Sequence, residues 1–78
     1  MGRITPIRFR DFERVLKEVG CEFVRQRGSH RVYTRSDLKR PLIVPRYKAI
    51  PVFIIKNNLR LLGLSDDEYL AILNRLSR

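Results

Sequence analysis

The sequence predicts an α+β fold in which helices cover one face of a three-stranded antiparallel sheet. Segments with helical periodicity, one before and two after, flank a central region of short strand-like segments, and strands grouped between helices are typical of this class. The chain has 78 residues, so we expect a single domain spanning residues 1–78. Its hydrophobic content of 44% is sufficient for a core of modest size.

Residues 9–19 are predicted to form the first helix because their apolar side chains recur with helical spacing. The apolar positions are Phe9, Phe12, Val15, Leu16 and Val19. Gly20 follows at the position where a left-handed C-terminal cap is expected, which indicates that the helix ends there.

The centre of the chain predicts three short strands. Residues 22–27 and 30–35 form the two strands of a hairpin, and Gly28-Ser29 between them is typical of a short turn. Residues 37–40 are polar and predict a second turn. Residues 42–44 then predict a third strand, which is bounded by Pro41 and Pro45 and therefore suited to a sheet edge.

Two further helices are predicted at the end of the chain. We expect Pro51 at the first position of one helix, and Gly63 ends it. Its apolar stripe consists of Val52, Ile55, Leu59 and Leu62. Ser65 and Glu68 form a capping-box pattern that starts the last helix. That helix has an apolar face made of Tyr69, Ile72, Leu73 and Leu76.

The charge of the chain is strongly basic and local. Seventeen Lys and Arg residues against eight Asp and Glu residues give a formal net charge of +9. Residues 25–48 contain eight of these cations and a single acidic residue, Asp37. This distribution favours a polyanionic partner, with nucleic acid ahead of an acidic protein or a membrane surface. The alternative is that these cations are solvated charges on the outside of the strands.

The single cysteine, Cys21, cannot form a disulfide within the chain, and the Cys and His ligands of a zinc site are lacking. We therefore expect Cys21 to be a core residue, and we expect no metal ion or other cofactor. No segment resembles a signal peptide or approaches the length of a membrane span. These observations predict a cytoplasmic protein that does not bind membranes.

His30 is the only histidine, and it follows Gly28-Ser29 between Arg27 and Arg31. An imidazole can act as a general base near neutral pH and could take the proton from a ribose 2′-hydroxyl group. Neighbouring arginines would hold the phosphate during RNA cleavage. The alternative is a histidine that caps a turn or binds phosphate passively. Ser29 is a poor nucleophile candidate because no acidic residue completes a triad.

Other polar and aromatic residues near His30 are candidates for RNA binding. Two tyrosines, Tyr33 and Tyr47, could stack on bases or donate to phosphate, although packing in the core is an equally good interpretation of each. The full set of RNA-binding candidates is Arg25, Arg27, Ser29, Arg31, Tyr33, Arg46, Tyr47 and Lys48.

Three segments resemble the HicA-type toxins, which are also called YcfA-like proteins. They are residues 20–30, which end in Gly-Ser-His, the Val44-Pro45-Arg46 triplet, and residues 61–68. The resemblance covers roughly residues 9–72. It implies a fold like a double-stranded-RNA-binding domain with an extra C-terminal helix. It also implies metal-independent cleavage of mRNA by one histidine, here His30, and a HicB-type antitoxin that covers the basic face.

The chain departs from this family pattern in two places. Tyr47 stands where many relatives carry a further histidine, and residues 50–55 are more apolar than the Pro-Gly-Thr stretch that is common in relatives. A phosphate contact at that helix start is therefore in question. Two other functions remain open, namely a non-catalytic module that binds double-stranded RNA and a partner of an acidic protein. We expect a monomer when the protein is free.

Overall fold

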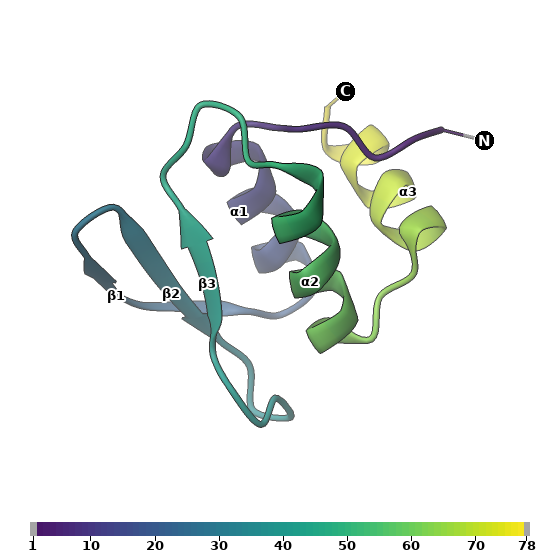
Figure 1. The fold of residues 1–78 in the computed structure, drawn as a ribbon. Helices are drawn as coiled ribbons and strands as arrows, with labels where there is room; N and C mark the ends of the chain where they lie inside the picture. Colours follow the sequence, from purple (N-terminus) through teal and green to yellow (C-terminus); the bar gives the residue numbers. More distant parts are fainter. Residues whose placement is uncertain (1, 78) are drawn as a thin grey trace.

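The computed structural model describes residues 2–77, and its elements follow the predicted order of helix, three strands and two helices (Figure 1). The predicted α+β class and the three-stranded antiparallel sheet are confirmed. The elements are α1 (Phe9–Glu18), β1 (Glu22–Arg27), β2 (His30–Thr34), β3 (Leu42–Pro45), α2 (Val52–Leu62) and α3 (Asp66–Leu76).

Helix α1 begins directly after Arg8, whose backbone is extended, and its apolar side chains face the core. The helix ends near Val19, and Gly20 has a φ of 91°, as the expected left-handed position requires. The amide of Cys21 then donates to the carbonyl of Leu16 at 2.9 Å. This turn directs the chain from α1 into β1, and Cys21 is buried as expected.

Strand β2 lies in the middle of the sheet, with β1 on one side and β3 on the other. His30 pairs with Arg27 on β1 and with Pro45 on β3, whereas Tyr33 pairs with Phe23 and Leu42. A bulge between Phe23 and Arg25 shifts the register of β1. The strand ends at Thr34, one residue earlier than predicted, and the Arg35 side chain instead donates to the carbonyl of Val19 at 2.8 Å.

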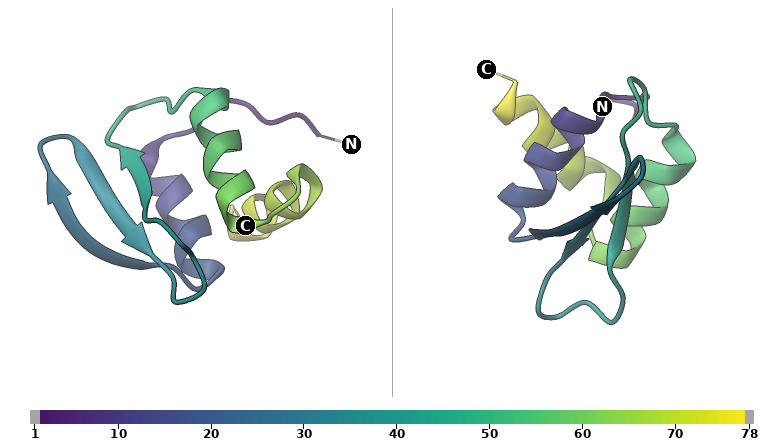
Figure 2. Two further views of the ribbon diagram at one scale, coloured as in Figure 1. Left: turned by 60° about the horizontal axis from the view of Figure 1, so that its bottom comes forward. Right: turned by 90° about the vertical axis from the view of Figure 1, so that its left-hand side faces the viewer.

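The helices cover only one face of the sheet. Tyr33, Leu42 and Val44 are fully buried in the core beneath the helices. Because side chains alternate along a strand, His30 and Val32 lie on the opposite face, which we call the open face; His30 is exposed there, whereas Val32 is buried. The β1–β2 hairpin projects away from the helices in Figure 1 and in the left view of Figure 2, and every residue of β1 is exposed.

The last two helices agree with the capping signals in the sequence. Pro51 is the residue before α2 and not its first helical residue, because its ψ of 151° is extended. Gly63 ends α2 with a φ of 69°, and Ser65 forms the predicted capping box with Glu68 at the start of α3. Helix α3 lies against α1, where the rings of Tyr69 and Phe12 meet edge to face at 6.2 Å. Within residues 2–77, no helix has the length and apolar character needed to cross a bilayer.

Candidate active site

His30 is exposed at the first position of β2, immediately after the hairpin turn. Gly28 supplies the positive φ of 58° that this tight turn requires. The side-chain amide of Gln26 donates to the Gly28 carbonyl at 2.9 Å and closes the turn from within. The backbone on both sides of the imidazole is therefore ordered by β pairing and by this turn.

Two backbone hydrogen bonds connect the His30 end of the sheet to the rest of the protein. The amide of Arg46 donates to the carbonyl of Ser29 at 2.8 Å, so the residues after β3 remain beside the hairpin turn. The amide of Phe9 donates to the carbonyl of Tyr47 at 3.2 Å, which links the same segment to the start of α1. The predicted candidates Ser29, Arg46 and Tyr47 are thus brought close to His30 in the backbone.

Two arginines share the open face with His30. Arg27 lies directly opposite His30, and Arg25 lies opposite Val32, so their side chains project from the same side of the sheet. Both arginines are exposed. Neither belongs to any of the ion pairs formed within residues 2–77. These two guanidinium groups are therefore available to an anionic ligand next to the imidazole.

Arg31, which we expected to contact RNA, lies on the face that α1 covers. Its guanidinium group forms an ion pair with Glu13, donates to Gln26 at 2.9 Å and stands 4.2 Å over the Phe23 ring. The hydrogen bond with Glu13 raises the pKa of Arg31 above its ordinary value. These contacts hold the Arg31 guanidinium group on the face opposite His30. We therefore do not include Arg31 in the proposed site.

Tyr33, also expected to contact RNA, is fully buried between the sheet and the helices. Its ring meets the Phe23 ring edge to face at 5.7 Å, and burial raises the pKa of its hydroxyl group to about 12. A base cannot stack on a ring that has no exposed face. The interpretation as a core residue therefore fits Tyr33, and the expected RNA contact does not fit this position.

The remaining candidates lie after β3. Tyr47 and Lys48 are exposed, and Tyr47 as a whole residue is 44% exposed. The Arg46 guanidinium stands 5.3 Å over the Phe9 ring, which directs it to the α1 side of the sheet. There it lines a hollow of about 300 Å³ together with Phe9, Arg10, Glu13, Gln26 and Arg31. Arg46 and Arg31 thus share a basic recess on the side opposite His30.

Glu13 is absent from the residues predicted for the site, and its carboxylate forms the ion pair that occupies Arg31 on the covered face. Glu13 is only 8% exposed because α1 presses it against the sheet. It lies four residues after Phe9 and three before Leu16, so its position on the apolar stripe was the available signal. A carboxylate at such a position requires a cationic partner, and Arg31 provides it.

The open face carries groups of the kind that acid–base chemistry on a phosphodiester requires. It combines one solvent-exposed imidazole with two unpaired guanidinium groups on adjacent strands. In the described part of the chain, His, Cys, Asp and Glu residues do not gather in groups of three that could hold a metal ion. Cys21 is buried, and this burial raises the pKa of its thiol.

This fold and this face define a small basic α+β protein with one exposed histidine beside free arginines. A family model described as the HicA toxin of bacterial toxin–antitoxin systems matches residues 9–64, which includes the whole sheet and α2. The chain therefore belongs to the HicA toxin family. Comparison with the curated proteins and with the solved structures finds no match. The likeness to double-stranded-RNA-binding domains accordingly stays a prediction.

Proposed function

We propose that this HicA-family toxin is an endoribonuclease that cleaves mRNA, with His30 as its catalytic residue. The observation that carries the proposal is the position of His30 on the open face, exposed and directly opposite Arg27. A ribose 2′-hydroxyl group can reach an exposed imidazole there, while an arginine from the adjacent strand contacts the phosphate.

In this mechanism the neutral imidazole of His30 accepts the proton of a ribose 2′-hydroxyl group. The 2′-oxygen forms a bond to the adjacent phosphorus, and the bond from phosphorus to the 5′-oxygen of the next nucleotide breaks. The products are a 2′,3′-cyclic phosphate and a 5′-hydroxyl group. Water has free access to the exposed site and can supply the proton that the leaving 5′-oxygen requires.

The arginines of the open face stabilise the transition state. Negative charge increases on the non-bridging phosphate oxygens as the 2′-oxygen attacks, and guanidinium groups donate charge-assisted hydrogen bonds to such oxygens. We assign this role to Arg27, which lies directly opposite His30, and to Arg25, two residues earlier in the same strand and on the same face. Ser29, Tyr47 and Lys48 lie at the same end of the sheet, where they would contact the flanking nucleotides.

The proposal extends to the partner and the cellular setting. Toxins of this family belong to toxin–antitoxin systems, and we propose a HicB-type antitoxin that covers the open face and His30. Such a cover would exclude mRNA from the imidazole. An mRNA substrate also implies action in the cytoplasm, and we propose that the free toxin is a monomer.

The test of this function is the dependence of cleavage on the 2′-hydroxyl group. A long single-stranded RNA that carries an efficient cleavage position is compared with the same RNA containing a 2′-deoxynucleotide only at that position. The proposal requires that the deoxy substitution abolishes cleavage there while other positions are still cut. Equal cleavage of both RNAs would exclude attack by the 2′-oxygen.

A non-catalytic RNA-binding module is the competing function, and the surface of α2 disfavours it. A module that reads duplex shape needs a dense basic cluster, and α2 contributes only Lys56 and Arg60. Lys56 is paired with Asp66 at 3.3 Å. The first turn of α2 instead exposes Phe53, which retains 73% of its surface.

A further inference from the structure

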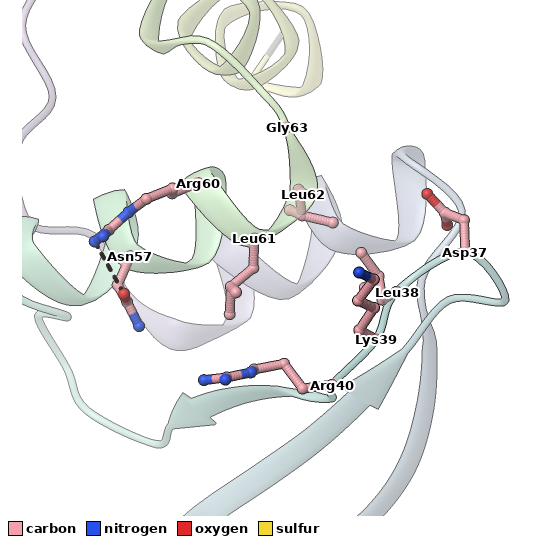
Figure 3. Close-up of a pocket in the computed structure, with 9 residues that line it drawn as sticks. All are labelled: Asp37, Leu38, Lys39, Arg40, Asn57, Arg60, Leu61, Leu62 and Gly63. Atoms are coloured by element: carbon pink, nitrogen blue, oxygen red, sulfur yellow. Dashed lines mark hydrogen bonds between the residues drawn. The ribbon is translucent and has the colours of Figure 1, made fainter.

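A second basic surface lies at the far end of β3, in a groove between α2 and the β2–β3 connection (Figure 3). The groove has a volume of about 580 Å³, and we call it the basic groove. Its walls are the turn residues Asp37, Leu38, Lys39 and Arg40 and the helix residues Asn57, Arg60, Leu61, Leu62 and Gly63. None of its residues belongs to the site around His30.

Three cations of the basic groove have no acidic partner among residues 2–77. Lys39, Arg40 and Arg60 are absent from the ion pairs of this part of the chain. The one acidic residue of the groove, Asp37, is bound to Arg35 at 2.6 Å. Arg60 donates to the side chain of Asn57 at 3.0 Å, which orients it without neutralising its charge. The groove therefore carries a net positive charge that is free to bind an anion.

A smaller hollow connects the basic groove to the open face. This hollow of about 180 Å³ shares Arg40, Asn57 and Leu61 with the basic groove, and Ile43 of β3 also lines it. Ile43 lies opposite Val32, on the face that carries His30, and it is 42% exposed. A continuous surface thus runs from His30 past Ile43 to Arg40.

The length of this surface follows from the strand geometry. His30 pairs with Pro45, and β3 runs back from Pro45 to Leu42, so the strand alone spans about 10 Å at roughly 3.4 Å per residue, and Arg40 lies two residues before its start. A ligand that contacts both ends must therefore be extended and must carry more than one anionic group. A single-stranded polynucleotide has this form, because it repeats phosphate groups along a flexible backbone.

We infer that the basic groove is a second phosphate-binding subsite, which holds the strand of an RNA whose reacting nucleotide lies at His30. This inference rests on the proposed function. In this inference Lys39, Arg40 and Arg60 bind backbone phosphates of the RNA. A base between the two sites packs on the exposed apolar surface of Ile43. Short RNAs would occupy only the His30 end, and longer RNAs would occupy both.

RNA fits this groove better than an acidic protein segment does, because the groove is continuous with the open face and has free cations at its end. The groove also lacks the apolar floor that anchors a helix, since charged and polar side chains outnumber its leucines. If the groove binds an acidic protein and not RNA, substitutions in the groove will leave the RNA affinity unchanged in the experiment below.

The experiment measures RNA binding, so its result is separate from that of cleavage. All proteins carry His30→Ala to prevent cleavage. One adds Lys39→Gln, Arg40→Gln and Arg60→Gln, and a matched control adds Arg3→Gln, Lys17→Gln and Arg14→Gln, which are likewise absent from the ion pairs within residues 2–77 and lie on other surfaces. Circular dichroism melts verify that each variant folds. Fluorescence anisotropy then gives affinity and salt dependence for labelled single-stranded RNAs of about 3 and about 12 nucleotides, within the range that single-strand grooves occupy.

The groove variant should bind the longer RNA roughly ten- to hundred-fold more weakly than the control at about 0.1 M salt, with a salt slope smaller by about 2, because three phosphate contacts are lost. Binding of the short RNA should be equal in the two proteins. Equal affinities and slopes for the longer RNA would overturn the inference, as would the absence of RNA binding by the parent His30→Ala protein. If the wild-type protein does not cleave RNA in a separate assay but the binding here still depends on the groove, only the proposed function is overturned.

Discussion

Arg31 and Glu13 form an ion pair between β2 and α1, whereas the side chain of His30, one residue earlier in β2, faces the other side of the sheet. These adjacent residues of β2 therefore differ in their expected roles, Arg31 in stability and His30 in activity. On the covered face, the ion pair between Arg31 and Glu13 connects the sheet to α1, whereas Arg25 and Arg27 on the open face belong to none of the ion pairs within residues 2–77. This division separates the effects of substitutions on stability from their effects on activity.

The Glu13–Arg31 pair is expected to contribute to stability. Glu13→Gln removes the charge that compensates a partly buried guanidinium group, so we expect the free energy of unfolding to fall by about 1–3 kcal/mol. Urea unfolding followed by circular dichroism measures the change. Arg27→Gln is the control, because Arg27 is exposed and belongs to none of the ion pairs within residues 2–77, and it should change stability by less than about 0.5 kcal/mol. A larger effect of Arg27→Gln than of Glu13→Gln would contradict this assignment.

Arg27→Gln should instead reduce RNA cleavage. We expect the single-turnover rate to fall about ten- to hundred-fold, because the substitution removes a donor that stabilises charge on the phosphate in the transition state. Single-turnover cleavage of a labelled RNA at saturating toxin measures this rate. Lys17→Gln, which removes a cation from the exposed side of α1, should cleave at the wild-type rate. Wild-type cleavage by the Arg27→Gln variant would remove Arg27 from the site.

Substitutions of the two tyrosines of the sheet region should differ in their effect on RNA binding. Tyr47→Ala is expected to weaken RNA binding by about 1–3 kcal/mol if its exposed ring stacks on a base, and it should leave the fold stable. Tyr33→Phe should leave RNA binding unchanged, because the Tyr33 ring is fully buried. Anisotropy titrations in the His30→Ala background measure both affinities. Weaker binding by the Tyr33→Phe variant alone would show that the buried ring does contribute to the RNA interface.

Alkaline pH should destabilise the protein through its buried tyrosines. Burial raises the pKa values of Tyr33 and Tyr69 to about 12, whereas tyrosines of an unfolded chain ionise near pH 10. Above about pH 10 the unfolded state releases protons that the folded state keeps, so the free energy of unfolding should decrease as the pH rises toward about 12. Urea unfolding at several values between about pH 8 and pH 11.5 gives this dependence.

The double variant Tyr33→Phe/Tyr69→Phe provides the control for that experiment. It cannot ionise at these two positions, so its stability should decrease less steeply over the same pH range. The rings remain in place, and the core is therefore retained. An equally steep decrease in the double variant would assign the alkaline loss to other groups.

The sequence was sufficient to predict the elements because each one has a local signal. The apolar periodicity of α1, the glycines at positions 20 and 63, and the Ser65–Glu68 capping box all depend on residues a few positions apart. The hairpin turn at Gly28-Ser29 is of the same kind, and it placed His30 correctly at the start of a strand. These signals required no knowledge of the tertiary structure.

The side-chain environment could be predicted only in part, because it depends on contacts that are distant in sequence. The bulge after Phe23 determines which residues of β1 lie opposite His30 and Val32, and no local pattern indicated it. Arg31 is occupied by a carboxylate 18 residues away in the chain. The cations of the basic groove come from the β2–β3 connection and from α2, which are distant in sequence. From the sequence alone they could be recognised only as contributions to the net charge.

The most direct test of the central claim compares RNA cleavage by the wild-type protein and by His30→Ala in the presence of EDTA. Both proteins are incubated with a long single-stranded RNA, and the products are separated on a denaturing gel. The mechanism predicts cleavage by the wild type and a rate about a hundred- to ten-thousand-fold lower for His30→Ala, with equal stability of the two proteins. Equal cleavage by a folded His30→Ala variant would contradict the assignment of His30 as the catalytic residue.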